Sequence, residues 1–304
     1  MARRRKSANK LIYIALSVLA AIILSIYGAK NGGFETPESN DIQLDYGAFS
    51  VHFIDVGQGD CSLIKTDKGN MLIDAGENGQ ENKVLSYLEK HGITELEYFV
   101  ATHPHSDHIG GAAEVINQIK VKNVIMPKLS AINTPTTQTY ENMLIAIKNS
   151  GAKVIASIPG KSYTFGDVSF TVLAPFKQDE NLNNMSVSLK LNYDNYSFMF
   201  TGDAEKEVEN QILNSETDIS ADVFKLAHHG SSTSNTQKFL KTISPEYAVI
   251  SCSSDNKYGH PHDEIIELLN NLGIDYYSTY KSGNIIFSVN EDGLCVNQVK
   301  TDDQ

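Results

Sequence analysis

Four side chains of the kinds that bind transition metals lie within six residues of this chain. Residues 102–111 read Thr-His-Pro-His-Ser-Asp-His-Ile-Gly-Gly, and the four are His103, His105, Asp107 and His108. Three imidazoles and a carboxylate held so close together need either solvent or a cation. On a loop after a strand, this spacing can direct the side chains at two adjacent metals. The stretch therefore predicts a metal site, and the alternative is a polar loop that merely contains many histidines.

Three later turns repeat one design, in which an apolar strand precedes a possible ligand and then a glycine or a helix start. Asp203 follows Phe-Met-Phe-Thr-Gly, His228 and His229 follow Lys-Leu-Ala, and His260 lies in Tyr-Gly-His-Pro-His. Each turn alone is weak evidence, because polar residues in turns are common. Together they predict that Asp203 and one of His228 and His229 join the metal site, with His260 beside them. A carboxylate such as Asp203 can bridge two cations.

Three further charged residues follow or end apolar runs. Asp55 ends His-Phe-Ile and Asp74 ends Met-Leu-Ile. A metal-bound histidine usually donates its second N–H to a carboxylate or a carbonyl. We predict this role for Asp74 and for Asp55; the alternative is a turn aspartate that accepts backbone hydrogen bonds. Lys225 is a candidate to bind a substrate phosphate, and a solvated lysine is the equal alternative.

The charge of the chain is negative and unevenly distributed. The net charge is -12, and residues 1–30 hold six of the 25 basic residues and no acid, which leaves 19 against all 37 acidic residues. An acidic surface repels polyanions at long range, which argues against a broad nucleic-acid-binding face. Two divalent ions would still add about four positive charges at one point. The three cysteines lie in apolar runs without CxxC spacing, which predicts small buried side chains.

The N-terminal segment predicts a membrane anchor. Residues 11–29 carry no charge over 19 positions, long enough to cross a hydrocarbon core of about 30 Å. The basic cluster before them predicts a cytoplasmic N-terminus and an exported remainder. We expect residues 1–30 to form a basic tip and an uncleaved anchor, 31–47 a linker, and 48–300 an extracytoplasmic domain of a single-pass protein of the cell membrane. The alternatives are a cleaved signal peptide and a buried helix.

Beyond residue 48, strand-like and helix-like runs alternate. Strands are expected over 50–54, 61–65, 70–73, 96–101, 121–126, 162–164, 168–174, 187–193, 197–200, 223–227, 248–251, 276–278, 285–289 and 294–298. Helices are expected over 83–91, 112–119, 140–150, 205–213, 236–242 and 263–272. This α/β pattern suits two packed sheets with helices outside. Ligands of such folds lie on the loops at one edge of the sheets.

With these residues in view, the chain resembles the metallo-β-lactamase superfamily, whose motif His-x-His-x-Asp-His corresponds to residues 103–108. More narrowly, residues 48–298 resemble the exported nuclease-like domain of ComEC-type competence proteins. The matching stretches are residues 53–60, 72–76, 102–111, 183–187, 201–205, 225–231 and 256–261. The multi-helix channel of those proteins is missing from the chain, so DNA translocation is not expected.

The resemblance implies an αββα sandwich with a site for two metals. His103 and His105 would hold one ion, Asp107 and His108 the other, and Asp203 would bridge them.

In the superfamily another histidine usually completes the first site, shortly before the bridging aspartate. This chain offers Asn184 and Ser186 there, which we expect to contact substrate. The first site is then richer in oxygen, or is completed by His228, His229 or His260. Zinc is the default for histidine and aspartate ligands, and manganese becomes plausible.

The sequence thus predicts a metal-dependent hydrolase that is anchored in the membrane and acts on a phosphodiester outside the cell, in nucleic acid or in an envelope polymer such as teichoic acid phosphorylcholine. A hydroxide between two metals would attack phosphorus. Asp107 would take part, and His228 or His260 would protonate the leaving group. The alternatives are an acyl hydrolase for lactones or β-lactams, and a metal-stabilised binding module for DNA uptake with little activity. No obligate protein partner is expected.

Overall fold

A computed structural model describes residues 46–131 and 133–300 of the chain, and in these residues the strands form one eight-stranded and one seven-stranded sheet. The first sheet has the order β15-β14-β1-β2-β3-β4-β5-β6. It is antiparallel from β15 to β3 and parallel from β3 to β6. Its strands are β1 (Phe49–Phe53), β2 (Ser62–Thr66), β3 (Gly69–Ile73), β4 (Glu95–Val100), β5 (Lys120–Met126), β6 (Lys153–Ala156), β14 (Asn284–Asn290) and β15 (Gly293–Val299).

The second sheet has the order β13-β12-β11-β10-β9-β8-β7. Its β7–β10 part is antiparallel and its β10–β13 part is parallel. The strands are β7 (Ser162–Phe165), β8 (Val168–Ala174), β9 (Ser188–Tyr193), β10 (Tyr196–Phe200), β11 (Val223–Lys225), β12 (Tyr247–Ile250) and β13 (Asp275–Ser278).

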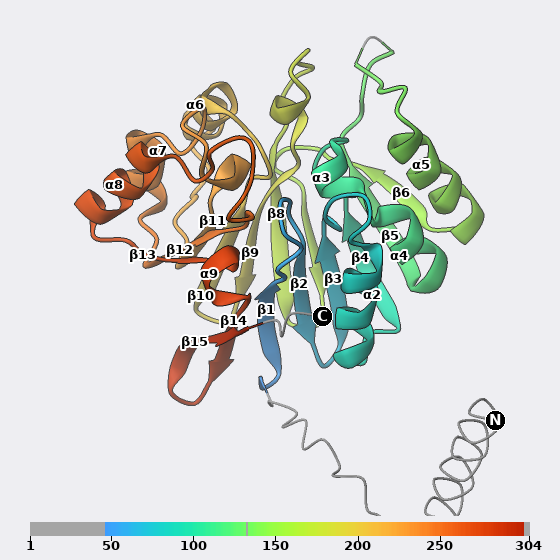
Figure 1. Cartoon of the computed structure of the whole chain (residues 1–304), viewed down its shortest axis with the longest axis horizontal. Helices are drawn as coiled ribbons and strands as arrows, with labels where there is room; N and C mark the ends of the chain where they lie inside the picture. The colour runs from blue at the N-terminus through green and yellow to red at the C-terminus, as the bar shows by residue number, and fades with distance from the viewer. Residues whose placement is uncertain (1–45, 132, 301–304) are drawn as a thin grey trace, which may run out of the picture. The chain divides into compact units, whose positions relative to one another are not determined.

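The helices cover the outer faces of both sheets (Figure 1). They are α2 (Glu81–Lys90), α3 (Ser106–Ile109), α4 (Ala112–Gln118), α5 (Gln138–Ser150), α6 (Lys206–Asn214), α7 (Gln237–Ile243), α8 (Asp263–Leu272) and α9 (Thr279–Ser282), with two 3-10 turns, η1 (Leu182–Met185) and η2 (Ala227–Gly230). Capping residues determine where several helices begin or end. The Thr137 side chain accepts a hydrogen bond from the N–H of Tyr140 at the start of α5, and Gly273 ends α8 at a φ of 69°.

The alternation of side chains along the strands builds three buried layers. Ile64 points between the sheets, where it joins Phe53 of its own sheet and Phe198 of the second. Its neighbour Leu63 points outward and packs under α2, α4 and α5. An equivalent outer layer lies under α6, α7 and α8. Burial of a large apolar side chain contributes roughly 1.5–3 kcal/mol. These layers confirm the predicted mixed α/β sandwich of two sheets.

The parallel halves of the two sheets decide where the polar loops lie. The carboxyl ends of parallel neighbours meet at one edge of a sheet, and ligands of α/β folds bind outside such ends. β3 and β4 are parallel neighbours in the first sheet, and β10, β11 and β12 in the second. The loops that follow β4, β10 and β11 carry the predicted metal ligands. The fold therefore brings together segments that are far apart in the sequence.

The structure corrects the predicted cell-membrane localisation. Across residues 46–131 and 133–300, no helix is long and apolar enough to cross a membrane. The predicted span, residues 11–29, lies outside the described residues, as do the basic tip and most of the linker. Tyr46, expected in the linker, places its ring edge-on against His52, with 5.3 Å between the ring centroids. A single-pass, extracytoplasmic protein thus finds no support in the described part of the chain.

Candidate metal centre

The loop after β4 carries the histidine motif into a closely packed corner. His103 and His108 are buried, whereas His105 and Asp107 are partly exposed. Asp107 and His108 lie in the short helix α3, which starts directly after the extended residue His105. A Cβ on Gly110 would collide with the backbone of residues 77 and 78. The glycine that follows the motif is therefore required by a close approach of two loops.

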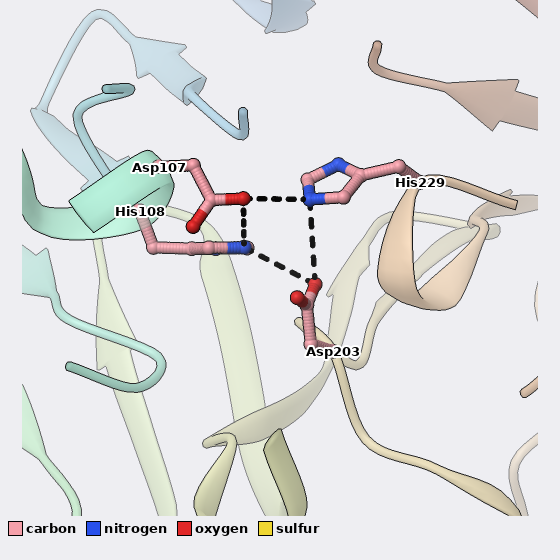
Figure 2. A group of neighbouring side chains, drawn as sticks. All are labelled: Asp107, His108, Asp203 and His229. Carbon is pink, nitrogen blue, oxygen red and sulfur yellow. Dashed lines mark hydrogen bonds and ion pairs between the residues drawn. The ribbon is translucent and has the colours of Figure 1, made fainter. Parts of the chain in front are cut away.

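One group of four ligand-type side chains contains Asp107, His108, Asp203 and His229, whose ligand atoms all lie within 4.8 Å of one another (Figure 2). Nε2 of His108 lies 3.1 Å from Oδ1 of Asp203. Nε2 of His229 lies 3.2 Å from Oδ2 of Asp107 and 3.8 Å from Oδ1 of Asp203. Figure 2 shows the side chains converging from α3, from the loop after β10 and from η2. We call this the four-ligand group.

A second group contains His103, His105 and Asp203, and we call it the three-ligand group. Nε2 of His103 lies 3.0 Å from Nδ1 of His105 and 3.6 Å from Oδ2 of Asp203. Nitrogens that share a tetrahedral zinc at 2.0–2.1 Å would lie about 3.3 Å apart, so this pair is close to the spacing of two ligands. Asp203 therefore offers Oδ1 to one group and Oδ2 to the other.

Partners on the far side of the rings orient His108 and His229. Nδ1 of His108 donates to Oδ2 of Asp74 at 2.7 Å, and Nδ1 of His229 donates to the Ser251 carbonyl at 2.9 Å. These bonds assign the tautomer that leaves both Nε2 atoms as acceptors. The position of Asp74 agrees with the predicted supporting role. Asp74 also accepts two hydrogen bonds from Thr102, at 2.8 and 2.7 Å.

The centre is electrostatically suited to cations. Burial alone would lower the pKa of His108, but the carboxylates of Asp203, Asp74 and Asp107 hold it well above its usual value. In the described residues, Nε2 of His108 and Oδ1 of Asp203 are buried without a hydrogen-bond partner. Such groups are rare because each unpaired buried polar atom costs about 1–3 kcal/mol. A divalent cation would satisfy both, so the residues fit a metal.

Ser186 comes from the region in which the resemblance implies an additional histidine. Its Oγ is 3.3 Å from Nδ1 of His103 and accepts a hydrogen bond from the Asp203 N–H at 3.0 Å. Ser186 is buried, and Asn184 has only 5% exposure. Asn184 accepts from the N–H of Glu205 at 3.1 Å. Both were predicted to contact substrate; the structure instead has them joining loops of the centre to one another.

Two environments were predicted for Lys225, a substrate phosphate and solvent, and the structure shows a third. It is 2% exposed, its ammonium lies 2.9 Å from Oδ1 of Asp60, and it donates to the Leu226 carbonyl at 3.0 Å. Asp60 Oδ1 also lies 3.2 Å from Nδ1 of His229. Burial would raise the pKa of Asp60, but Lys225 and His229 lower it to about 2. Substrate binding by Lys225 is corrected accordingly: the lysine is buried in an ion pair behind His229.

The sequence interpretation assigned no role to Asp60, although it closes the Gly-x-Gly turn of residues 57–60. The signal in the sequence was the position of Asp60 directly after Gly-x-Gly. The structure shows why the second glycine is needed, since Gly59 has a φ of 137° and a Cβ there would collide with the Asp107 carbonyl. Asp55 matches the alternative of a turn aspartate. Its carboxylate accepts a hydrogen bond from the Gly57 N–H at 3.1 Å and lies 4.0 Å from the Lys83 ammonium.

His228 and His229 both point into the centre because of an uncommon backbone. Their φ angles are 50° and 55°, in the left-handed region that non-glycine residues seldom adopt, at a cost of about 1–2 kcal/mol each. Nε2 of His228 lies 3.7 Å from Oδ2 of Asp203, and its Nδ1 is 3.1 Å from the Thr233 hydroxyl. The His228 side chain is 22% exposed, so it faces the open side of the centre.

His260 lies beside the centre. Its ring centroid is 5.3 Å from that of His228 and 5.9 Å from that of His229. Among the described residues it belongs to neither ligand group. Burial and the neighbouring His229 lower the pKa of His260 to about 4. Its position is consistent with the predicted place next to the metal ligands.

The comparisons with known proteins agree with this geometry. The family model described as the metallo-beta-lactamase superfamily matches residues 54–254. The chain belongs to the metallo-beta-lactamase superfamily. The fold and the two ligand groups support a metal-dependent hydrolase with two divalent ions.

Among its curated relatives are competence proteins, which confirms the predicted resemblance. ComE operon protein 3 of Bacillus subtilis (strain 168) is 32% identical over 254 residues, 77% of this chain and 32% of that protein. Competence protein ComA of Neisseria gonorrhoeae is 28% identical over 244 residues, 79% of this chain and 32% of that protein. The chain thus spans about a third of the length of these relatives.

A similar solved structure is CmlA, a diiron beta-hydroxylase from Streptomyces venezuelae. It matches with a TM-score of 0.56 and 11% identity, over 79% of this chain and 54% of that chain. At this identity the likeness shows the fold alone, because one fold supports several reactions.

Proposed function

We propose that this chain is a metal-dependent phosphodiesterase. The observation that supports the proposal most directly is Asp203, whose two oxygens face two separate groups of metal-type ligands. Two divalent ions bound by these groups would lower the pKa of a bound water toward about 7 and neutralise charge on the substrate oxygens. Zinc suits the imidazoles, and manganese suits the three-ligand group, where Ser186 stands in place of a histidine.

The chain's own residues supply the proton chemistry. Asp107 is partly exposed, and one of its oxygens lies 3.2 Å from Nε2 of His229, which leaves the other to accept a hydrogen bond from the attacking water. His228 is outside the four-ligand group, and its ring is held through Nδ1 by Thr233. Its side chain is partly exposed, so the ring can donate a proton to the leaving oxygen of a substrate bound there. His260 lies behind His228 and limits the positions of its ring.

The substrate is proposed on two grounds. The competence proteins among the relatives favour a phosphodiester of nucleic acid, and a phosphodiester of an envelope polymer would undergo the same chemistry. A net charge of -12 opposes a broad polyanion-binding surface. Two cations at one point offset this negative charge locally, so we expect the protein to contact its substrate mainly close to the scissile bond.

The experiment is hydrolysis of bis-p-nitrophenyl phosphate with added zinc or manganese, with nitrocefin and a lactone as acyl substrates. We expect turnover of the phosphodiester, and a loss of roughly a hundredfold or more in His103→Ala and Asp203→Asn. His91→Ala, which removes a histidine at the end of α2, should remain active. Faster turnover of an acyl substrate would favour the acyl hydrolase. Absence of turnover with any metal would favour the binding module. Full activity of His103→Ala would show that the turnover does not come from this metal centre.

A further inference from the structure

A groove of about 310 Å³ lies beside the metal centre, between the loop after β12 and the elements α8, β13 and α9. Pockets that hold small molecules have volumes of about 300–1,000 Å³, so the groove is large enough for one small unit. The polar residues in its lining include Ser253, His260, Asp263, Tyr276, Tyr280 and Lys281.

Two connections tie the groove to the four-ligand group. The Ser251 carbonyl accepts the hydrogen bond that orients His229, and Ser253, two residues further along, lines the groove. The N–H of Ser253 donates at 3.3 Å to Gln58, in the turn that also carries Asp60. On the other side, the His260 ring lies 5.9 Å from the His229 ring. The groove therefore begins where the metal centre ends.

The backbone and the ring of His260 are both held in place by neighbouring side chains. The Asn256 side chain accepts from the His260 N–H at 2.9 Å and donates to the His260 carbonyl at 2.6 Å. The ring stacks on Tyr258 with 5.6 Å between centroids. His260 is 9% exposed, yet among the described residues its Nδ1 has no hydrogen-bond partner. A buried polar atom of this kind is costly unless a ligand or water satisfies it.

The charge and shape of the groove restrict its occupant. Lys281 is exposed, and its ammonium lies 5.3 Å from the Tyr280 ring centroid. An ammonium and hydroxyls suit one phosphate, whereas the Asp263 carboxylate opposes a row of several. Two tyrosines suit the flat face of a base, because stacking on aromatic rings binds any base. The occupant is thus a single nucleotide.

We propose that this groove is the subsite for the nucleotide next to the scissile bond in a single-stranded nucleic acid. Lys281 pairs with the phosphate of that nucleotide, Tyr276 and Tyr280 contact its base, and the His260 ring borders its sugar. The proposal rests on the proposed function, since it specifies the substrate of that site.

The test compares a substrate that fills only the metal centre with substrates that also reach the groove. These are bis-p-nitrophenyl phosphate, a thymidine trinucleotide and a glycerol-phosphate trimer. In Lys281→Met, we expect the KM for the trinucleotide to rise roughly tenfold, with kcat/KM for bis-p-nitrophenyl phosphate within about twofold of the wild type. Lys241→Met removes an exposed lysine from α7 and should change neither.

A binding measurement separates failure of the groove from failure of the enzyme. The full chain, treated with chelator, is titrated into fluorescein-labelled trinucleotide and followed by anisotropy. Weaker binding by Lys281→Met supports the groove even if nothing is hydrolysed, in which case only the proposed function fails. Turnover of bis-p-nitrophenyl phosphate with an unchanged trinucleotide KM overturns the groove alone. A Lys281 effect confined to the glycerol-phosphate trimer overturns the nucleotide assignment.

Discussion

At the scale of single residues, the two ligand groups differ in how strongly hydrogen-bond partners orient their histidine rings. Oδ1 of Asp203 faces His108 and His229, and each of these rings is oriented from behind by a buried partner. Oδ2 faces His103, whose Nδ1 lies 3.2 Å from the Thr102 hydroxyl and 3.3 Å from the Ser186 hydroxyl. Carboxylate and carbonyl partners raise the basicity of a ligating imidazole. The four-ligand group is therefore expected to bind its ion more tightly than the three-ligand group.

Substitution of Lys225 tests whether the buried ion pair behind His229 affects stability and zinc binding. Lys225→Met leaves the Asp60 carboxylate buried without its cation, a loss that destabilises proteins by about 3–5 kcal/mol. We expect the unfolding free energy to fall by that order. We also expect zinc affinity to fall roughly 10–100-fold, because partners behind ligating histidines have effects of this size. Denaturant unfolding and calorimetric titration with zinc measure the two.

The control for Lys225 removes both charges. The double variant Lys225→Met with Asp60→Asn holds no unpaired buried charge, so most of the stability should return. Zinc affinity should stay below that of the wild type, because Asp60→Asn removes the carboxylate beside His229. Unaltered zinc affinity in the single variant would show that the ion pair supports only the fold.

At the scale of elements, short loops interlock around α3. The N–H of Asp60 donates to the Asp107 carbonyl at 3.1 Å, that of Ala75 to His108 at 2.7 Å, and that of Gly110 to Gly76 at 2.8 Å. Two turns that are separate in the sequence thus support one helix of four residues. A helix this short cannot form alone. The pattern of residues 102–111 predicted ligands on a loop, and it could not show the helix that neighbouring turns stabilise.

The sequence allowed some elements and contacts to be predicted and not others, for physical reasons. The strands β4, β10 and β11 are apolar and buried, so their ends and the polar residues after them were predictable. β6 reads Lys-Val-Ile-Ala and is largely exposed at the edge of its sheet, so its four residues give no buried strand pattern to recognise. The pairing of Asp60 with Lys225 depends on contact between the two sheets. Neither residue carries a local sign of its partner, so the lysine was predicted to be at the surface.

The end of α2 shows how burial overrides a local rule. A cation at a helix C-terminus is normally favourable, and His91 lies at the C-terminal end of α2. Burial, with Lys65 and Lys90 nearby, lowers the pKa of His91 to about 4. The unfolded chain, with a pKa near 6.5, takes up the proton first. The stability that this residue contributes is present above pH 6.5 and is lost as the pH falls toward 4.

Replacement of His91 by glutamine removes this titration. Between pH 7.5 and pH 4.5 we expect the unfolding free energy of the wild type to fall by roughly 1–2 kcal/mol more than that of His91→Gln, a value reduced for the partial exposure of the ring. Urea unfolding with chelator present measures the difference without a contribution from metal. Equal losses in the two proteins would show that His91 titrates in the same way whether the chain is folded or unfolded.

At the scale of the whole molecule, the metal centre lies on the boundary between the two sheets. His103, His105, Asp107 and His108 follow β4 of the first sheet, whereas Asp203 and His229 follow β10 and β11 of the second. Each ligand group includes residues from both sheets. Ions bound there would therefore join the two halves of the sandwich, and the stability of the whole domain should depend on metal.

Chelation is the direct test of this dependence. A ligand that binds only the folded state at about 1,000 times its Kd stabilises it by about 4 kcal/mol, which corresponds to a shift in Tm of roughly 8–16 °C for a domain of this size. We expect chelator to lower the Tm of the wild type by this order. Asp203→Asn should lose most of the shift, because Asp203 belongs to both groups, and Asp107→Asn only part of it. Asp167→Asn, on the turn between β7 and β8, should retain it. A full shift in Asp203→Asn would mean that the ions that stabilise the fold bind elsewhere.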